Sequence, residues 1–524
     1  MSAHQCPGHA NALHGENGEL VLQPQPSRDP NDPLNWSPVR KYINFAIVAL
    51  YTLWIFTILD IGTVAWQVVT ERYHLSYNDL TDGYASNLAG LAFGCVLFIP
   101  FALKFGRRPV YISSTFASFI CAIWAGFATT PTNIILSQLL AGLAGAIAET
   151  LVYMTIADIF FTHQRGRATA VLSLFVLAGS FLAPICAGYI LEAQGWQWSY
   201  WYTAIFLGIT CAAFIFFYEE TKYTPPSAIL GRPPASSTVG TVTNAFRDMT
   251  DTKAGSLCQA QTVTSSIELS SRINHTIPLK SYRERLAFTT NTPGGWPKLF
   301  QHMYQPLLLL GQFPAVTFVA VEYGCLLSWL SMMVSTQSSY FPYEPYNFSP
   351  SAIGLLSLPP FIGSILGAVW CGPVSDWSIQ VLAKRNKGVF QPEMRLYIMI
   401  VPAILSPRLP WIVPCLGMAI NGFGLTGMGG LCSIFLLDSY KEIVADGFVV
   451  VAFMRNMLAM VVVFSLTPWI EGMGVQNTFI LVGAMCLFIN LLMIPMIIFG
   501  KKWRLTCGDR YEKMAALQFA PRST

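Results

Sequence analysis

The chain has 524 residues, of which 53% are hydrophobic and only 11% are charged. A water-soluble domain carries about 25% charged residues, so this composition excludes a soluble globular protein and places most of the surface in lipid. The net charge of +4 does not indicate nucleic-acid binding, because the basic residues lie beside the ends of apolar segments. The twelve cysteines show neither a CxxC pair nor a Cys/His metal spacing, so we expect no metal and no cofactor.

Apolar segments close to the ~20 residues of a transmembrane helix recur along the chain. Six precede a polar interruption from Glu219 to Met303, and about six follow it. The expected spans are 42–66, 83–103, 109–129, 133–156, 168–191 and 196–217 in the first half, and 306–333, 352–371, 447–470 and 478–499 with the longer segment 396–437 in the second. This pattern predicts an all-α polytopic membrane protein with about 12 transmembrane helices.

The segment 396–437 departs from this regularity. Its 42 residues must hold two helices and a turn, and two helices of ~20 residues use nearly all of them. Only the eleven residues 396–406 precede the sequence Pro407-Arg408-Leu409-Pro410. We therefore expect a ninth helix that is short or broken.

Basic residues collect in alternate loops, among them those at 40–41, 104–108, 165–167, 384–395 and 501–504, whereas the other loops hold only Arg72 and Arg408. The positive-inside rule then predicts that both termini and the central linker are cytoplasmic. We further expect the membrane to be the plasma membrane. The expected parts are a cytoplasmic N-terminal tail at 1–38, a six-helix bundle at 39–218, a mostly disordered cytoplasmic linker at 219–303, a second six-helix bundle at 304–500, and a cytoplasmic tail at 501–524.

Three local features complete this topology. Within the linker we expect a short helix near Tyr282–Leu286, and we expect Trp296–Tyr304 to lie on the membrane surface. The loop that precedes the eighth span faces outside and contains the sequon Asn347-Phe-Ser349. Asn347 is therefore a candidate for glycosylation, although the following Pro350 weakens the sequon.

Several motifs point to one family. They are DPLNWS (32–37), FGRRPVY (105–111), DIFFTHQRGRA (158–168), YEETKY (218–223), GPVSDW (372–377) and Met454-Arg455-Asn456. With them the chain resembles a fungal transporter of the major facilitator superfamily, in the drug:proton antiporter-like branch that includes polyamine and cation carriers and secondary-metabolite exporters. The resemblance implies two six-helix bundles around a central site, a small-molecule substrate, protons as the coupling ion, and function as a monomer.

The chain departs from this family pattern at three places. Ile99 and Leu103 stand where the loop after the second helix usually has a glycine and an acid. Gln138 replaces the arginine that often precedes Gly142 and to which the family assigns a role in proton coupling. The antiporter motif of the fifth helix survives only as Gly179, Ala183-Pro184 and Gly188. Proton antiport is therefore less strongly indicated than transport itself.

Four charged residues fall inside expected spans: Asp60, Glu149, Glu322 and Arg455. A charge at the bilayer centre costs at least ~2.5–3.5 kcal/mol on insertion scales, so it faces a cavity or a partner. In the family arrangement the first, fourth, seventh and tenth helices line the cavity, so the three acids are candidates for substrate or proton binding. Asp60 alternatively lies in the outer interface, Glu149 alternatively makes a structural hydrogen bond, and Arg455 is better explained as an ion-pair partner than as a ligand.

Further candidates lie on the same helices. Trp54, Tyr153 and Trp329 are suited to stacking or cation–π contact with a flat or cationic ligand, with lipid-facing placement as the alternative. Asn421, in a glycine-rich stretch of the tenth helix, is a candidate substrate contact.

Two other sets of residues are expected to act in gating or packing. Gate or structural ion pairs are expected among Lys104, Arg107, Arg108, Asp158, Arg165, Asp376, Asp438 and Arg455. Close helix packing or kinking is expected at Gly142, Gly145, Gly179, Pro184 and Gly188. The alternative for the bases is that they only set the membrane orientation.

These observations favour a secondary active transporter that works by alternating access, with proton-coupled efflux of a toxic compound or secondary metabolite as the first hypothesis. Uptake of polyamines or other cations is the alternative, because acidic residues in a cavity suit cations. A membrane sensor that does not transport is a further alternative. Enzymatic activity is not expected, because the sequence contains no phosphate-binding loop, nucleophile elbow or metal-ligand cluster.

Overall fold

The computed structural model describes residues 29–223, 278–290, 296–344, 346–375, 377–378, 381–382, 395–397, 399, 414–440 and 443–517. Every regular element in this part of the chain is a helix. The N-terminal half comprises α1 (Pro38–Asp60), η2 (Ile61–Ala65), α2 (Trp66–Tyr73), α3 (Tyr77–Phe105), α4 (Arg107–Gly126), α5 (Pro131–Gly145), η3 (Ala146–Glu149), α6 (Leu151–Ile159), α7 (Thr162–Leu177), η4 (Ala178–Leu182), α8 (Ala183–Gln194) and α9 (Trp196–Phe216).

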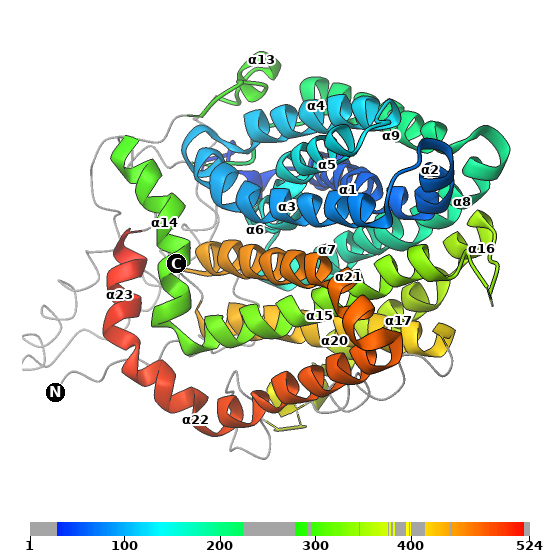
Figure 1. Cartoon of the computed structure of the whole chain (residues 1–524). Coiled ribbons are helices and arrows are strands. Elements are labelled where there is room, and N and C mark those ends of the chain that lie inside the picture. Colours follow the sequence, from blue (N-terminus) through cyan, green and yellow to red (C-terminus); the bar gives the residue numbers. More distant parts are fainter. Residues whose placement is uncertain are drawn as a thin grey trace, which may run out of the picture.

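The C-terminal half follows the linker and lies beside the first half, below it in Figure 1. After the short α13 (Tyr282–Arg285) come α14 (Trp296–Gln312), α15 (Pro314–Tyr340), α16 (Pro350–Leu355), α17 (Leu358–Val369), η6 (Trp370–Val374), α20 (Pro414–Ser439), α21 (Val444–Leu491), α22 (Met493–Thr506) and α23 (Gly508–Leu517). The two halves meet mainly where α3 packs against α21. This all-α architecture agrees with the fold predicted from the apolar segments.

Ten helical segments of the described chain are long and apolar enough to cross a membrane. Six of them precede the linker, as predicted. The last runs from Val444 to Thr506, and Gly474 interrupts it with φ 75° and ψ 159°. Figure 1 shows the chain reversing direction there, so this segment supplies two crossings and the described residues supply eleven. The expected short ninth helix lies almost wholly outside the described residues.

The seventh span begins later than the sequence predicts. Helix α14 ends at Gln312, and α15 starts at Pro314 rather than near residue 306. Phe313 between them is extended, with φ −124° and ψ 99°. Proline is favoured at the first position of a helix, so Pro314 favours the start of a new helix there. Pro306, in contrast, lies inside α14.

The described part of the predicted C-terminal tail, residues 501–517, is largely helical. Helix α23 follows α22 and packs against the C-terminal half. The rings of Tyr511 and Tyr440 lie 5.8 Å apart, and the Cys507 thiol donates to the Gln312 carbonyl at 3.4 Å.

Small residues allow the helices of the N-terminal half to approach closely. A Cβ added to Gly142 would collide with the Asn87 carbonyl oxygen, and one on Gly145 would come within 2.8 Å of Ile55. A Cβ on Gly179 would come within 2.5 Å of the Leu53 carbonyl oxygen. These glycines therefore pack α5 against α3 and α1, and η4 against α1, as small residues do between membrane helices.

The fifth span contains a local change in helix geometry. A π-helical turn at Ala178–Leu182 separates α7 from α8, and Pro184 lies in the first turn of α8. Because proline lacks a backbone N–H, the wider turn before it accommodates the missing hydrogen bond.

The Gly142→Ala substitution tests the α3–α5 contact. We expect it to destabilise the protein by about 1–3 kcal/mol, because the added methyl group overfills a packed interface. The matched control is Gly472→Ala, where no atom lies within 4 Å of the added Cβ. Thermal unfolding in detergent micelles should show a lower midpoint only for Gly142→Ala, and equal midpoints for both variants would contradict the packing.

Candidate functional site

A cavity of about 90 Å³ lies between the two halves. Its walls come from α1, η2, α3, η3, η4 and α8 on one side and from α15, α16, α17 and α21 on the other. The polar residues that line it are Asp60, Thr63, Tyr84, Asn87, Glu149, Ser180, Gln337, Ser338, Ser357 and Asn456. Two of the three predicted acids therefore reach the space between the halves.

Asp60 lies at one wall of this cavity. It is the last residue of α1, where the chain changes from an α-helix to the 3-10 helix η2. The Ser180 hydroxyl of the π-helical turn lies within hydrogen-bonding reach of its carboxylate. The carboxylate thus has a neutral donor and access to the cavity.

Glu149 connects the two halves. The 3-10 turn η3 and the irregular Thr150 (φ −130°, ψ −51°) interrupt the fourth span at this position. Arg455 of α21 forms an ion pair with the Glu149 carboxylate, and Asn456 donates to its other oxygen at 2.6 Å. The Arg455 guanidinium also lies 4.9 Å from the centre of the Tyr323 ring on α15. A charged network of three spans therefore crosses the interface.

Glu322 has a different environment. Its side chain is buried, it does not line the cavity, and one carboxylate oxygen has no hydrogen-bond partner in the described part of the chain. Cys325 and Cys432 are its close electrostatic neighbours. The third predicted acid therefore lies within the packing of the C-terminal half.

None of the three predicted aromatic ligands lines the cavity. Trp54 stacks on Phe206 of α9 at 4.3 Å, on a face where Phe206 is exposed. Trp54 precedes Asp60 by six residues, so the directions of the two side chains differ by about 240° around the helix axis. Trp54 therefore takes the lipid-side placement that was the alternative.

The other predicted contacts have structural neighbours. Trp329 packs with Met332 and Leu466. Its neighbour in the sequence, Leu330, does line the cavity. Tyr153 stacks on Phe448 of α21 at 5.9 Å, so it packs between the halves without reaching the cavity. Asn421 is partly buried in α20 and does not line the cavity either.

A neutral hydrogen-bond chain occupies the position where the family resemblance predicts an arginine. Asn87 of α3 donates to Gln138 at 2.9 Å, and Gln138 donates to the Tyr200 hydroxyl at 3.3 Å. This chain joins α3, α5 and α9 beside the central cavity, with no charge on any of its members.

The long helices run between two ends of the molecule. One is the basic end, described next; the other carries α2 and the loop 341–349, and we call it the opposite end. There the two halves touch directly: the Tyr77 hydroxyl donates to Tyr343 at 3.1 Å, and the Ser351 N–H donates to Glu192 at 3.0 Å. A Cβ on Gly188 would approach the Pro350 carbonyl oxygen to 2.7 Å. The opposite end is therefore closed in this conformation. Asn347, with φ 46°, is exposed on this loop.

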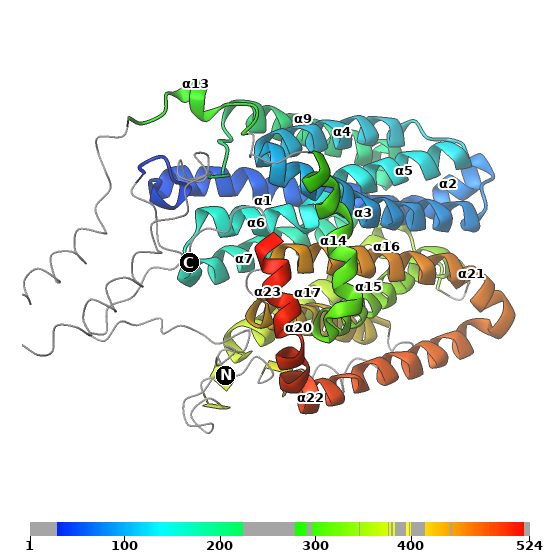
Figure 2. The same cartoon turned by 90° about the vertical axis from the view of Figure 1, so that its left-hand side faces the viewer.

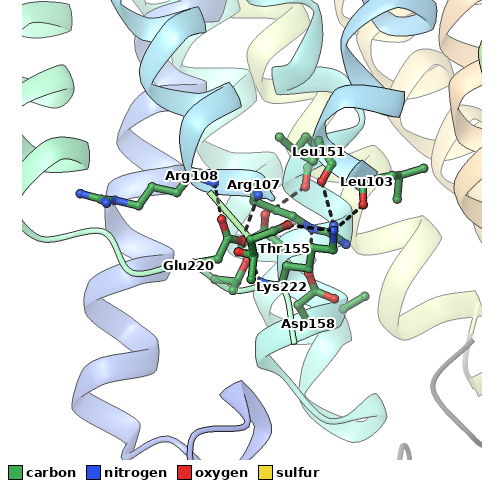
Figure 3. Close-up of polar contacts among 12 residues, drawn as sticks. Leu103, Arg107, Arg108, Leu151, Thr155, Asp158, Glu220 and Lys222 are labelled. Carbon is green, nitrogen blue, oxygen red and sulfur yellow. Dashed lines mark hydrogen bonds and ion pairs between the residues drawn. The ribbon is translucent and has the colours of Figure 1, made fainter. Parts of the chain in front are cut away.

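The other end, here called the basic end, carries a charged cluster that Figure 3 shows. Arg107 donates to Asp158 at 3.1 Å and so joins α4 to α6. The Glu220 carboxylate accepts the backbone N–H groups of Arg107 and Arg108 at 2.9 and 3.1 Å. A carboxylate at this place satisfies the free donors at the N-terminus of α4 and complements the helix dipole.

Lys222 completes the cluster from the same short segment as Glu220. Its ammonium group donates to the carbonyls of Leu103 and Lys104 at 2.5 and 3.0 Å, at the C-terminal end of α3. Burial, together with the nearby Arg107, lowers the pKa of Lys222 to about 8. Glu220 and Lys222 were not singled out as individual residues, although the YEETKY motif contains both.

The remaining predicted gate residues have separate partners. Arg108 donates to the carbonyls of Ile215 and Leu286, and Arg165 donates to those of Phe160 and Ala157, so neither pairs with Asp158. Asp438 pairs with Arg395 at 2.6 Å. Lys104 lies 4.1 Å from the centre of the Trp296 ring. Asp376 lies outside the described residues.

Among the described residues, no three His, Cys, Asp or Glu side chains are grouped so that they could hold a metal ion.

Comparison with known proteins identifies the family. The family model described as "Major Facilitator Superfamily" matches residues 43–443. The chain belongs to the major facilitator superfamily.

Three similar proteins place this major facilitator among fungal transporters. It is 28% identical to an uncharacterized MFS-type transporter of Schizosaccharomyces pombe, over 95% of this chain and 90% of the relative. It is 28% identical to Protein HOL1 of Saccharomyces cerevisiae, over 93% and 90% of the two chains. It is 26% identical to a multidrug transporter of Candida glabrata, over 87% and 74%.

The Arg455→Leu substitution tests the ion pair between the halves. We expect it to cost about 3–5 kcal/mol, because it leaves the Glu149 carboxylate buried without its cation. The double variant Glu149→Leu, Arg455→Leu removes both charges and should recover much of this loss. Thermal unfolding midpoints of the two single variants and the double variant provide the measurement, and additive losses would contradict the pairing.

Proposed function

We propose that this major facilitator moves a small organic molecule by alternating access, with the two halves rocking around the cavity that holds Asp60 and Glu149. The observation that carries the proposal is the contact of Glu149 with Arg455 and Asn456, because it joins the halves at the wall of that cavity. A group that binds Glu149 in place of Arg455 would change how firmly the halves are held together. No enzymatic step is proposed.

The charge of the cavity favours a cationic substrate. Two carboxylates line it, and one guanidinium offsets one of them. In the part of the chain that the structure describes, the neutral Ser180 hydroxyl is the donor beside the Asp60 carboxylate and no cation pairs with it, so it is available to pair with an ammonium group. Phe56 and Tyr84 line the same space and supply aromatic surface for a cation or a flat ligand.

Proton coupling follows from competition at the same carboxylates. A proton on Glu149 removes its charge and weakens its attraction for Arg455, so the contact between the halves loosens. A cationic substrate at Asp60 excludes a proton there for the same electrostatic reason. Proton and cationic substrate would then compete at Asp60, as antiport requires, whereas a proton on Glu149 would loosen the contact between the halves.

The ends of the molecule supply gates in this proposal. The closed opposite end faces outside, and the basic end, with the pairs Arg107–Asp158 and Arg395–Asp438, faces the cytoplasm. Both termini are then cytoplasmic, in agreement with the positive-inside rule. We place the protein in the plasma membrane as a monomer of two six-helix bundles, with Asn347 exposed for glycosylation.

Export of a toxic compound or secondary metabolite is the first candidate, since one relative is named a multidrug transporter. Uptake of polyamines or other cations is the second candidate, and the acidic cavity favours it. Both use the same carboxylates and differ in the direction of net flux.

Inside-out plasma-membrane vesicles from cells with and without the protein distinguish the two directions. Under an imposed proton gradient, acid inside, we expect vesicles that contain the protein to accumulate a fluorescent organic cation, because this orientation reports efflux from the cytoplasm. Uptake of labelled spermidine by intact cells, with no accumulation in the vesicles, would favour the second candidate. No protein-dependent flux in either assay would contradict transport and support a sensor.

The neutralising variants Asp60→Asn, Glu149→Gln and Glu322→Gln test the carboxylates one at a time. We expect Asp60→Asn and Glu149→Gln to abolish the dependence of transport on pH, because each removes a charge that lines the cavity. Glu322→Gln should retain transport if its role is packing, and should lose only proton coupling if it binds a proton. Glu344→Gln, on the exposed opposite-end loop, is the control. The hypothesis fails if Asp60→Asn and Glu149→Gln both keep wild-type pH dependence.

A further inference from the structure

Helix α14 has an apolar stripe that no described residue covers. Trp296, Phe300, Tyr304 and Leu308 are 58%, 58%, 54% and 46% exposed. They are spaced four residues apart, so they lie along one face of the helix. Three of the four are aromatic, and Leu307 beside them is also exposed.

The other face of α14 is buried in the protein. Leu299, His302, Gln305 and Leu309 alternate with the exposed residues, and each of these four is at most 2% exposed. The helix is therefore firmly seated, and the orientation of its apolar stripe is set by this packing. A seated helix with large aromatic side chains directed outward needs an apolar environment on that side.

Helix α14 contacts both halves at the basic end. The Trp296 ring lies against Lys104 and 6.4 Å from the Phe105 ring, both at the end of α3. Gln305 donates to Asp446 of α21 at 3.2 Å. Figures 1 and 2 both show α14 lying crosswise to the long helices that it touches.

The position of α14 indicates what covers the stripe. The helix leads through Phe313 directly into α15, a membrane-spanning segment, so it begins where the bilayer does. It also lies crosswise to the spans, as a helix in the plane of a membrane surface does. Tryptophan and tyrosine are enriched at the depth of the lipid headgroups, and amphipathic helices bury an apolar face at that depth.

We propose that α14 is a membrane-surface helix whose Trp296–Phe300–Tyr304–Leu308 stripe lies among the lipid headgroups of the leaflet at the basic end. The lipid then holds in place an element that touches α3 and α21, the two helices at the interface of the halves. Movement of these helix ends during gating would require α14 to shift within the lipid surface.

The test uses the full-length protein in lipid nanodiscs and measures lipid contact directly, so its outcome does not depend on transport. The background replaces Cys6, Cys186, Cys258 and Cys415 by Ala, because Cys186 and Cys415 are exposed and Cys6 and Cys258 lie outside the described residues. A nitroxide label is then attached at Phe300→Cys or Tyr304→Cys. Power-saturation measurements compare collision with oxygen, which concentrates in lipid, and with a water-soluble nickel chelate.

Two control sites have similar exposure but known surroundings. Phe488→Cys, 68% exposed on the last membrane-spanning segment, reports lipid, and Leu279→Cys, 61% exposed in the linker, reports water. We expect the labels on α14 to collide more with oxygen and less with nickel than Leu279→Cys does, with values between the two controls, because the headgroup region lies between water and the hydrocarbon core. Values that match Leu279→Cys would place α14 in water and overturn the proposal. Exclusion of both reagents would also overturn it, because protein would then cover the stripe.

Discussion

One buried ion pair between the two halves organises the centre of this protein. Arg455 would be costly in the bilayer without Glu149, because moving one charge out of water is not offset unless a partner lies beside it. The pair also requires that the fourth and eleventh spans meet face to face, with Asn456 and Tyr323 completing the contact. The cavity lies beside this contact, and the irregular backbone at Thr150 directly follows Glu149 at the interface.

A second constraint operates at the basic end, where helix ends would otherwise expose unpaired backbone groups. Glu220 accepts the first N–H groups of α4, and Lys222 donates to the last carbonyls of α3. Both come from one segment after α9, so this segment holds the ends of two neighbouring helices together. The arrangement links the ends of α3 and α4 on either side of Gly106, in a chain where Leu103 occupies the position at which the family pattern has an acid.

The apolar segments predicted most of the fold, since a bilayer demands a continuous apolar length for every crossing. Asp60 and Glu149 could be singled out because intramembrane charges are expensive wherever they occur. The same argument selected Glu322, but a buried carboxylic acid can also lie within helix packing, and the sequence does not distinguish the two. The aromatic candidates do not line the cavity in this conformation, because a span presents several faces and neither Trp54 nor Trp329 lies on the face toward the cavity.

The sequence by itself determined the membrane environment, the two sets of spans, the family and the charges that needed partners. These follow from composition and segment length, which depend only on local residues. The tertiary structure decided which charges meet, which end is closed and which face each helix presents. Those properties depend on helix rotation and on kinks at Thr150, Phe313 and Gly474, and such rotations arise from packing between residues that are distant along the chain.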